Sequence, residues 1–337
     1  MARPSVTVVG AGGIAGAWFP ALHNERVRIA GIVDINRERA EQRAREFAPA
    51  APVFTSLATA LATTRPDFIL DLTVPEAHCS VPCAALRAGC HVIGEKPMAD
   101  SMRAARHMTR TAERTHRLFM VSQSRRWDVH HDRVRRTLAA GRLGTLTTIN
   151  CDFYIGAHFG GFRDLMDSPL ILDMAIHHFD LARYFTGADP VAVYCHEFNP
   201  AGSWYRGHAA ATCIFEMSNA IVFTYRGSWC AEGCHTSWNG DWRIIGTRGT
   251  LICARDEEPH GQILAGTAGF NRPLAPLAVA RSPLRFGAMH GALREMLAFL
   301  RRGILPQTEC HDNIKSLAMV FAAIESARRR ARVSVKW

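Results

Sequence analysis

Residues 6–15 read VTVVGAGGIA, an apolar β-branched run that passes into glycines and then opens a helical segment. The pattern G-x-G-x-x-[GA] is filled here by Gly10, Gly12, Gly13, Ile14 and Ala15 together with Ala11. Such glycines permit a tight turn and let a phosphate approach the backbone, where the positive end of the helix attracts it. The stretch therefore predicts a strand, a turn and a helix that bind the pyrophosphate of a dinucleotide.

An acidic residue follows the glycine loop at the spacing that such a site needs. Asp34 ends the second predicted strand, 22 residues beyond Gly12. A carboxylate there accepts hydrogen bonds from a ribose 2′-hydroxyl and repels a 2′-phosphate, which favours NAD over NADP. Arg37 leaves NADP open, because a nearby arginine accepts that phosphate.

The first 123 residues alternate β-branched runs with helical patterns, which is typical of a parallel sheet with crossover helices. The predicted strands are Val6–Val9, Val27–Val33, 52–55, Phe68–Thr73, His91–Ile93 and Leu118–Ser122. The predicted helices are Arg37–Phe47, Ala77–Ala88 and Asp100–Thr115, with Asp100 or Ser101 as the cap of the third. We expect an α/β Rossmann dinucleotide-binding domain over residues 1–123.

The pattern changes from Trp127 onward, where we expect an α+β domain over residues 124–337. Its predicted helices are His131–Ala140, Leu170–Phe185, Met289–Arg302 and Asp312–Arg330. Its predicted strands are Val191–Phe198, Ala209–Glu216, Ala220–Gly227, Thr236–Ile245, Thr250–Ala254 and Val333–Val335, most of them antiparallel. Residues 255–287 lack periodicity and predict a long loop.

Composition excludes several classes of protein. The 337 residues are 48% hydrophobic, with no run that approaches a membrane span and none at the start that resembles a signal peptide, so we expect a cytoplasmic protein without a membrane partner. The net charge of +10 comes from arginines spread along the chain, which argues against nucleic acid. Ten cysteines without a C-x-x-C pair indicate reduced thiols, and Cys230, Cys234 and His235 lack a second ligand pair, so we expect no metal.

Lys96 is the first catalytic candidate. Only three of the 40 basic residues are lysines, and this one lies in the stretch GEKP at 94–97, directly after a predicted strand. An ε-ammonium takes part in proton chemistry more readily than a guanidinium does. Because ligands bind at the carboxyl edge of a parallel sheet, we expect Glu95 and Lys96 beside the nicotinamide, and Thr73, Pro75 and His78 in the cofactor cleft.

A second catalytic candidate lies in the predicted helix Leu170–Phe185. Residues three and four apart share a helix face, which places Asp173, His177 and Asp180 together. A carboxylate on one ring nitrogen orients an imidazole and leaves the other nitrogen to take a proton. We interpret His177 as a general base, and His178, which points elsewhere, as a packing residue.

The order of these motifs resembles the Gfo/Idh/MocA oxidoreductase family. The resemblance extends to WRIIGTRGTL at 242–251, and it implies an open-faced, mostly antiparallel second sheet used for substrate binding and for a homodimer or homotetramer. It also implies that Lys96 is the catalytic lysine, Asp173 its acidic partner and His177 the base, acting with NAD(P) on a sugar, cyclitol or related polyol. Two positions depart from the family pattern: Asp167-Ser168-Pro169 replaces a glycine run, and Glu76 replaces an asparagine.

The substrate contacts and the type of turnover stay open at this point. We expect Arg126, Trp127, Tyr154 and His158 to contact the substrate together with Lys96, Asp173 and His177, because they lie at or after the domain junction. Two alternatives to a dehydrogenase remain. One is an enzyme that retains NAD while it cleaves or epimerises a glycoside, and the other is an NAD-binding regulator without turnover.

Overall fold

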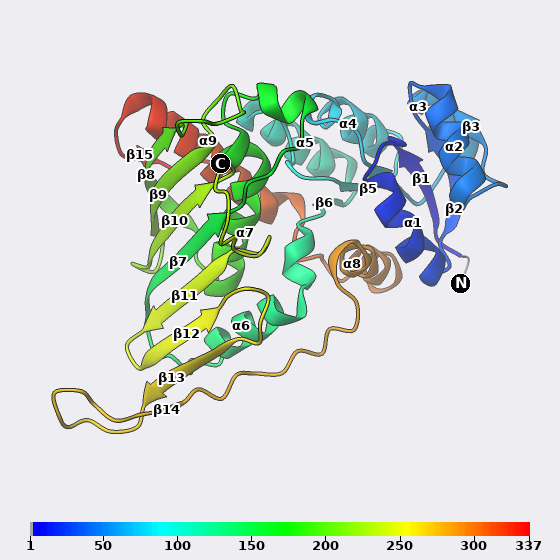
Figure 1. The fold of residues 1–337 in the computed structure, drawn as a ribbon. Coiled ribbons are helices and arrows are strands. Elements are labelled where there is room, and N and C mark those ends of the chain that lie inside the picture. The colour runs from blue at the N-terminus through cyan, green and yellow to red at the C-terminus, as the bar shows by residue number, and fades with distance from the viewer. Residues whose placement is uncertain (1–2) are drawn as a thin grey trace. The chain divides into compact units, whose positions relative to one another are not determined.

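The computed structural model describes residues 3–337, which form two compact units (Figure 1). The first unit runs to Ser124 and also includes Phe286–Leu317, and the second consists of Arg125–Arg285 and Ala318–Trp337. The sequence predicts one domain over 124–337, whereas residues 286–317 lie in the first unit. They do so because helix α8 (Ala288–Arg302) packs on α1 (Ala15–Asn24). In addition, Nε2 of His290 on α8 lies at hydrogen-bond distance, 2.8 Å, from Oε1 of Glu25.

Within its described residues, the first unit holds a six-stranded parallel sheet in the order β3-β2-β1-β4-β5-β6. The strands are β1 (Ser5–Val9), β2 (Arg28–Val33), β3 (Val53–Phe54), β4 (Phe68–Asp71), β5 (His91–Gly94) and β6 (Phe119–Val121). The strand order reverses between β1 and β4. Ligands bind at the carboxyl ends of the strands at such a point, which is where the glycine loop and Thr73 begin.

Three helices of the first unit begin after a residue whose side chain caps them. The helices of this unit are α1, α8, α2 (Arg37–Phe47), α3 (Leu57–Thr64), α4 (Ser80–Arg87) and α5 (Met102–Thr115), with the short 3-10 turn η1 (Pro75–Ala77). The 3-10 turn η2 (Ser124–Trp127) begins at the last residue of this segment and belongs mostly to the second unit. The side chains of Asn36, Ser56 and Ser101 each accept a backbone N–H of the first turn that follows. Of the two caps predicted for α5, Ser101 is the one that forms.

The second unit is built on a nine-stranded sheet within the described chain, in the order β14-β13-β12-β11-β7-β10-β9-β8-β15. Its neighbours pair antiparallel, except that β10 runs parallel to β7. The strands are β7 (Leu146–Tyr154), β8 (Pro190–Phe198), β9 (Ala210–Met217), β10 (Val222–Ser228), β11 (Asp241–Gly246), β12 (Gly249–Cys253), β13 (His260–Leu264), β14 (Leu274–Pro276) and β15 (Val333–Ser334). The helices are α6 (Val129–Ala139), η3 (Gly161–Leu165), η4 (Leu170–Ala175), α7 (Ile176–Thr186) and α9 (Cys310–Arg329), which begins in the first unit.

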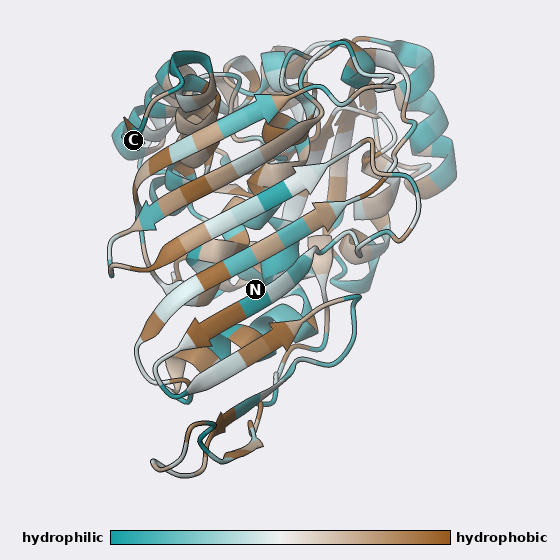
Figure 2. Cartoon of the chain, turned by 60° about the vertical axis from the view of Figure 1, so that its left-hand side comes forward, coloured by the Kyte–Doolittle hydropathy of each residue, from teal (hydrophilic) through white to brown (hydrophobic). Residues whose placement is uncertain are grey.

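One face of this sheet is the core of the unit and the other is open. Phe215, Phe223 and Trp242 are fully buried beneath the helices, where Phe179 of α7 packs edge-on against Phe215. On the opposite face, hydrophobic and hydrophilic residues are interspersed along the strands, and Tyr194 is 47% exposed (Figure 2). The predicted fold class, a Rossmann domain followed by an open-faced and mostly antiparallel sheet, is confirmed.

Four local predictions need correction, and the first is that strand β7 is absent from the predicted strands. Residues 255–287 are not a structureless loop, because β13 and β14 form a hairpin within them. The predicted helix Leu170–Phe185 begins with the π-helical turn η4 before α7. Helix α3 is absent from the prediction. No helix among residues 3–337 has the length and apolar character needed to span a membrane.

Candidate active site

The glycine loop between β1 and α1 has one position where only glycine fits and two positions that face open space. Gly10 has a φ of +96°, and a Cβ atom there would lie 2.6 Å from the carbonyl oxygen of Leu72. An added Cβ at Gly12 or Gly13 would meet no atom within 4 Å. The backbone at the start of α1 is therefore open to the close approach of a pyrophosphate, and these residues fit a dinucleotide.

Asp34 is bonded to the glycine loop. Its carboxylate accepts hydrogen bonds from the backbone N–H groups of Ala11 and Asn36, both at 2.8 Å. Arg43 of α2, which the sequence does not single out, donates to the carbonyl oxygens of Ala11 and Gly12, both at 3.3 Å. Asp34 thus fixes the turn in addition to the ribose contact that we predict for it.

Arg37, the residue that leaves NADP open, lies on the exposed side of α2. Its Nε pairs with Glu41 at 2.7 Å, and the two side chains are 66% and 38% exposed. An exposed pair of this kind contributes little free energy, so Arg37 can leave Glu41 at low cost. The choice between NAD and NADP stays a prediction.

His78 links the loops that follow β4 and β5. Its Nδ1 lies 2.6 Å from the carbonyl oxygen of Pro97, and its Nε2 lies 3.1 Å from that of Thr73. Pro75 begins the turn η1, which ends just before this histidine. At the end of β4, burial raises the pKa of Asp71, whose Oδ1 accepts the hydroxyl of Thr73 at 2.5 Å. Thr73 and His78, which we predict to lie in the cofactor cleft, are therefore joined by hydrogen bonds to each other, to Asp71 and to Pro97.

Glu95 fixes the backbone from which Lys96 extends. The indole N–H of Trp18 on α1 donates to Oε1 of Glu95 at 3.0 Å, and the backbone N–H of Lys96 donates to Oε2 at 3.3 Å. Burial raises the pKa of Glu95, although the bond from Trp18 and the charge of Lys96 act against it. The peptide bond between Lys96 and Pro97 is cis. The position of Lys96 is thus tied to α1 as well as to β5.

Asp173 and His177 lie on consecutive helical segments of the second unit. Asp173 belongs to the π-helical turn η4 and His177 to the first turn of α7. Arg163 of η3 donates from Nε to Oδ2 of Asp173 at 2.7 Å. The sequence does not predict this arginine, because its loop has no periodicity that would relate it to the helix.

Asp180, predicted on the same face as His177, has an arginine partner as well. Arg126 binds it through two hydrogen bonds, from Nε at 2.7 Å and from Nη2 at 2.6 Å, and both side chains are buried. The neighbouring Trp127 is also buried. The sequence predicts that Arg126 contacts the substrate. In the structure, its guanidinium is instead paired with Asp180 inside the protein.

The other predicted substrate residues are accessible to different degrees. Tyr154 ends β7 and is half-buried, and burial raises the pKa of its phenol. His158 is exposed and stacks on Trp204 with a centroid separation of 3.6 Å. Its Nε2 lies 2.9 Å from Oε1 of Glu232. Both positions stay predictions as substrate contacts.

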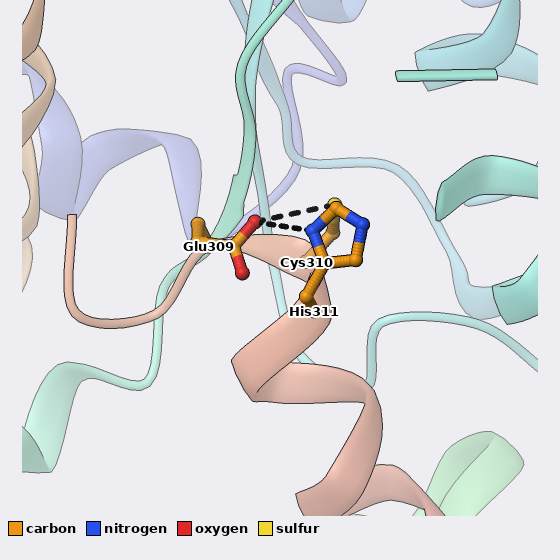
Figure 3. Close-up of side chains that lie close together, drawn as sticks. All are labelled: Glu309, Cys310 and His311. Carbon is orange, nitrogen blue, oxygen red and sulfur yellow. Dashed lines mark hydrogen bonds and ion pairs between the residues drawn. The ribbon is translucent and has the colours of Figure 1, made fainter. Parts of the chain in front are cut away.

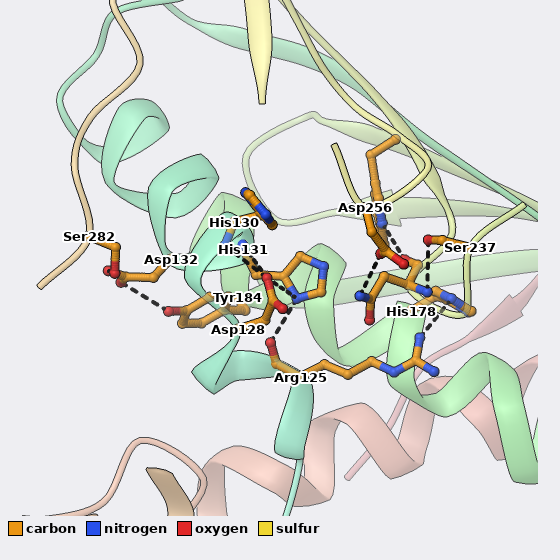
Figure 4. A network of polar contacts seen from close by, with 12 residues as sticks. Arg125, Asp128, His130, His131, Asp132, His178, Tyr184, Ser237, Asp256 and Ser282 are labelled. Atoms are coloured by element: carbon orange, nitrogen blue, oxygen red, sulfur yellow. Dashed lines mark hydrogen bonds and ion pairs between the residues drawn. The ribbon is translucent and has the colours of Figure 1, made fainter. Parts of the chain in front are cut away.

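His178 is a packing residue whose Nε2 faces Arg125, a contact drawn in Figure 4. Its ring is fully buried, and burial lowers its pKa well below the ordinary value. Its Nε2 lies 3.2 Å from Nη1 of Arg125, whose own pKa is lowered by burial to about 10. A neutral imidazole accepts this bond, so His178 orients Arg125 and is a poor candidate for a base.

Two family models match the chain. The model of the oxidoreductase family with an NAD-binding Rossmann fold, GFO_IDH_MocA, covers residues 5–123, and that of the GFO/IDH/MocA C-terminal domain covers residues 131–252. The chain belongs to the GFO/IDH/MocA oxidoreductase family. The match over 5–123 confirms the predicted NAD-binding Rossmann domain.

Relatives of this oxidoreductase include enzymes named for sugars and cyclitols. The D-apiose dehydrogenase of Paraburkholderia graminis is 26% identical over 91% of this chain and 83% of its own. An inositol 2-dehydrogenase of Rhizobium meliloti is 23% identical over 80% of this chain and 81% of its own. The solved structure of an oxidoreductase from Agrobacterium radiobacter, in complex with NAD+, L-tartaric acid and magnesium, aligns over 99% of both chains with a TM-score of 0.87 at 21% identity, and this likeness supports the fold.

A possible metal-binding group in the oxidoreductase has another explanation. Among residues 3–337, donor atoms of Glu309, Cys310 and His311 lie within 4.8 Å of one another (Figure 3). Glu309 accepts the backbone N–H of Asp312, as an N-cap does, and its Oε2 lies 2.8 Å from Nδ1 of His311. Burial raises the pKa of the Cys310 thiol, which disfavours the thiolate that binds metals. Helix capping and hydrogen bonding thus account for this group.

Proposed function

We propose that this oxidoreductase transfers a hydride between the nicotinamide of NAD and a secondary alcohol or ketone of a sugar, cyclitol or related polyol. The observation that carries the proposal is the loop after β1, where Gly10 tolerates no side chain and Gly12 and Gly13 face open space at the start of α1. Asp34 would bind the ribose, and Thr73, His78 and Glu95 would line the cofactor site. The names of the D-apiose and inositol dehydrogenases support the substrate class.

The chemistry of the protein residues follows from their types. NAD supplies the acceptor for the hydride. His177 takes the proton of the reacting hydroxyl, since an imidazole accepts a proton near neutral pH. Lys96 donates a hydrogen bond to the same oxygen, and Asp173 balances the charge that develops on its neighbours. In the reverse direction, the same residues return the proton to the oxygen.

Turnover with a panel of sugars, sugar acids and cyclitols tests the proposal. Nicotinamide absorbance should change steadily with NAD and at least one compound, and Lys96→Ala and His177→Ala should abolish that change. Lys336→Ala is the matched control and should leave the rate unchanged. Bound NAD that never exchanges while the sugar is cleaved or epimerised would favour the retained-cofactor reaction instead. Bound NAD with no chemistry on any compound would favour a regulator.

The open face of the second sheet supports a homodimer or homotetramer. Tyr194, Ile214 and Val222 are each at least 40% exposed there, and large exposed hydrophobic side chains on one face support a protein interface. Sedimentation equilibrium should give a mass of two or four chains, and Ile214→Lys should lower it. We also propose a cytoplasmic location, because all ten cysteines are free, as is usual in a reducing compartment.

A further inference from the structure

We propose that Arg163 is the positioning residue for Asp173, holding one carboxylate oxygen and keeping the group ionised during turnover. The inference rests on the proposed function, in which Asp173 serves the proton transfer. The Nε of Arg163 donates to Oδ2 at 2.7 Å, a charge-assisted contact between side chains that are 32% and 15% exposed.

The guanidinium of Arg163 is held in place by aromatic rings. Its Cζ lies 5.0 Å from the ring centroid of Phe159 and 4.8 Å from that of Phe162, within the range of cation–π contacts. Phe159 in turn contacts Trp229 and Trp238 at centroid separations of 5.3 and 6.1 Å. An arginine fixed in this way loses little further side-chain entropy when it binds a carboxylate.

The loop that carries Arg163 is also bonded to its surroundings. Gly160 and Gly161, each with a φ of +69°, turn the chain into η3. On the other side of the arginine, the backbone N–H of Arg206 donates to the carbonyl oxygen of Asp164, and that of His208 to the carbonyl oxygen of Asp167, both at 2.8 Å. Gly207 packs so closely that a Cβ there would lie 2.1 Å from the oxygen of Asp167. The loop therefore presents Arg163 to Asp173 from a fixed backbone.

Removal of the charge at 163 tests the inference through the pH profile of turnover. Arg163→Gln should lower kcat by about tenfold to a hundredfold with a smaller change in KM, because a misplaced catalytic group costs up to that much. The acid limb of the kcat profile should move up, because loss of the cation favours the protonated forms both of Asp173 and of the proposed base His177, four positions further along the chain. Arg163→Lys should restore part of both effects.

The control is the neighbouring pair of Arg206 and Asp167, which is highly exposed and joined at 2.9 Å. Arg206→Gln removes an arginine of the same loop region and should leave both kcat and the pH profile unchanged. An Arg163→Gln enzyme with the profile of the unaltered protein would overturn the inference. So would a loss of kcat without a shift of the acid limb and without rescue by lysine.

A second measurement separates this inference from the proposed function. The carboxyl carbon of Asp173 can be titrated by NMR in the unaltered protein and in Arg163→Gln, with Asp173→Asn giving the assignment. An upward shift of that titration in Arg163→Gln supports the inference even if no compound of the panel is turned over. An unchanged titration contradicts it, whatever the activity.

Discussion

Replacement of Arg126 by methionine should destabilise the second unit strongly. Arg126 and Asp180 form two hydrogen bonds at 2.6 and 2.7 Å, and the residues are 4% and 2% exposed. Removing one partner of a buried ion pair costs about 3 to 5 kcal/mol. For a unit of this size, each kcal/mol lowers Tm by about 2 to 4 °C, so the expected fall is roughly 6 to 20 °C.

Thermal melting followed by circular dichroism measures this fall in Tm. A double variant and a control at an exposed ion pair test whether the lost pairing causes it. Arg126→Met combined with Asp180→Leu removes both charges and should recover most of the loss, because a well-packed apolar pair often replaces a buried ion pair at little cost. Arg37→Met breaks an exposed pair and should change the free energy of unfolding by less than about 1 kcal/mol.

One outcome would refute the reasoning about Arg126. If Arg126→Met melts like the unaltered protein but binds substrate poorly, the arginine contacts substrate, as the sequence predicts, and its pairing with Asp180 contributes little to stability.

Three further predictions follow from local geometry. Gly10→Ala should lower both Tm and NAD affinity, because its Cβ would meet the neighbouring backbone. Gly12→Ala should lower NAD affinity, measured by calorimetry, and leave Tm unchanged. Equal Tm values for the two variants would contradict this. His311 has carboxylates on both ring nitrogens and a raised pKa, so its stabilisation is complete below its ordinary pKa and is lost as the pH rises through the raised value; His311→Asn should therefore lower Tm at pH 6 more than at pH 9. Cys195 and Cys213 are buried cross-strand partners with sulfurs 3.4 Å apart, and burial raises the pKa of the Cys213 thiol, so iodoacetamide should alkylate the exposed Cys234 before either of them in the native protein, as peptide mass spectrometry would show; earlier alkylation of Cys195 or Cys213 would contradict this.

The local features of the first unit are predictable from the sequence because each is decided by adjacent residues. The loop after β1 follows from its glycines, since Gly10 needs a positive φ and close backbone contact. Ser101 caps α5 through its own hydroxyl. The alternation of strands and helices predicts the parallel sheet, and with it the edge where Thr73 and Glu95 lie.

The partners of the site residues could not be predicted, because they come from distant parts of the chain. Arg126 and Asp180 are 54 positions apart, and Arg125 and His178 are 53 apart. Nothing in either segment encodes the pairing, which depends on how α7 packs in the second unit. Helical spacing alone relates Asp180 to its own helix and does not reveal its arginine.

Irregular backbone, loop composition and contacts between distant segments explain further differences. The π-helical turn η4 changes the spacing of side chains between Leu170 and Ala175, so a simple 3.6-residue repeat does not describe this part of the predicted helix. The strands β13 and β14 lie among glycines and prolines that hide the alternation of a hairpin. Helix α8 joins the first unit through contacts with α1, and its own amphipathic pattern does not specify that partner.

The most direct test of the proposed function is nicotinamide absorbance in the presence of NAD and a panel of sugars, sugar acids and cyclitols. We predict steady reduction of NAD with at least one compound, and its loss in Lys96→Ala and in His177→Ala while NAD binding is retained. Confirmed NAD binding without any change in absorbance across the panel, or turnover that survives both substitutions, would contradict the proposed hydride transfer and the roles assigned to these residues.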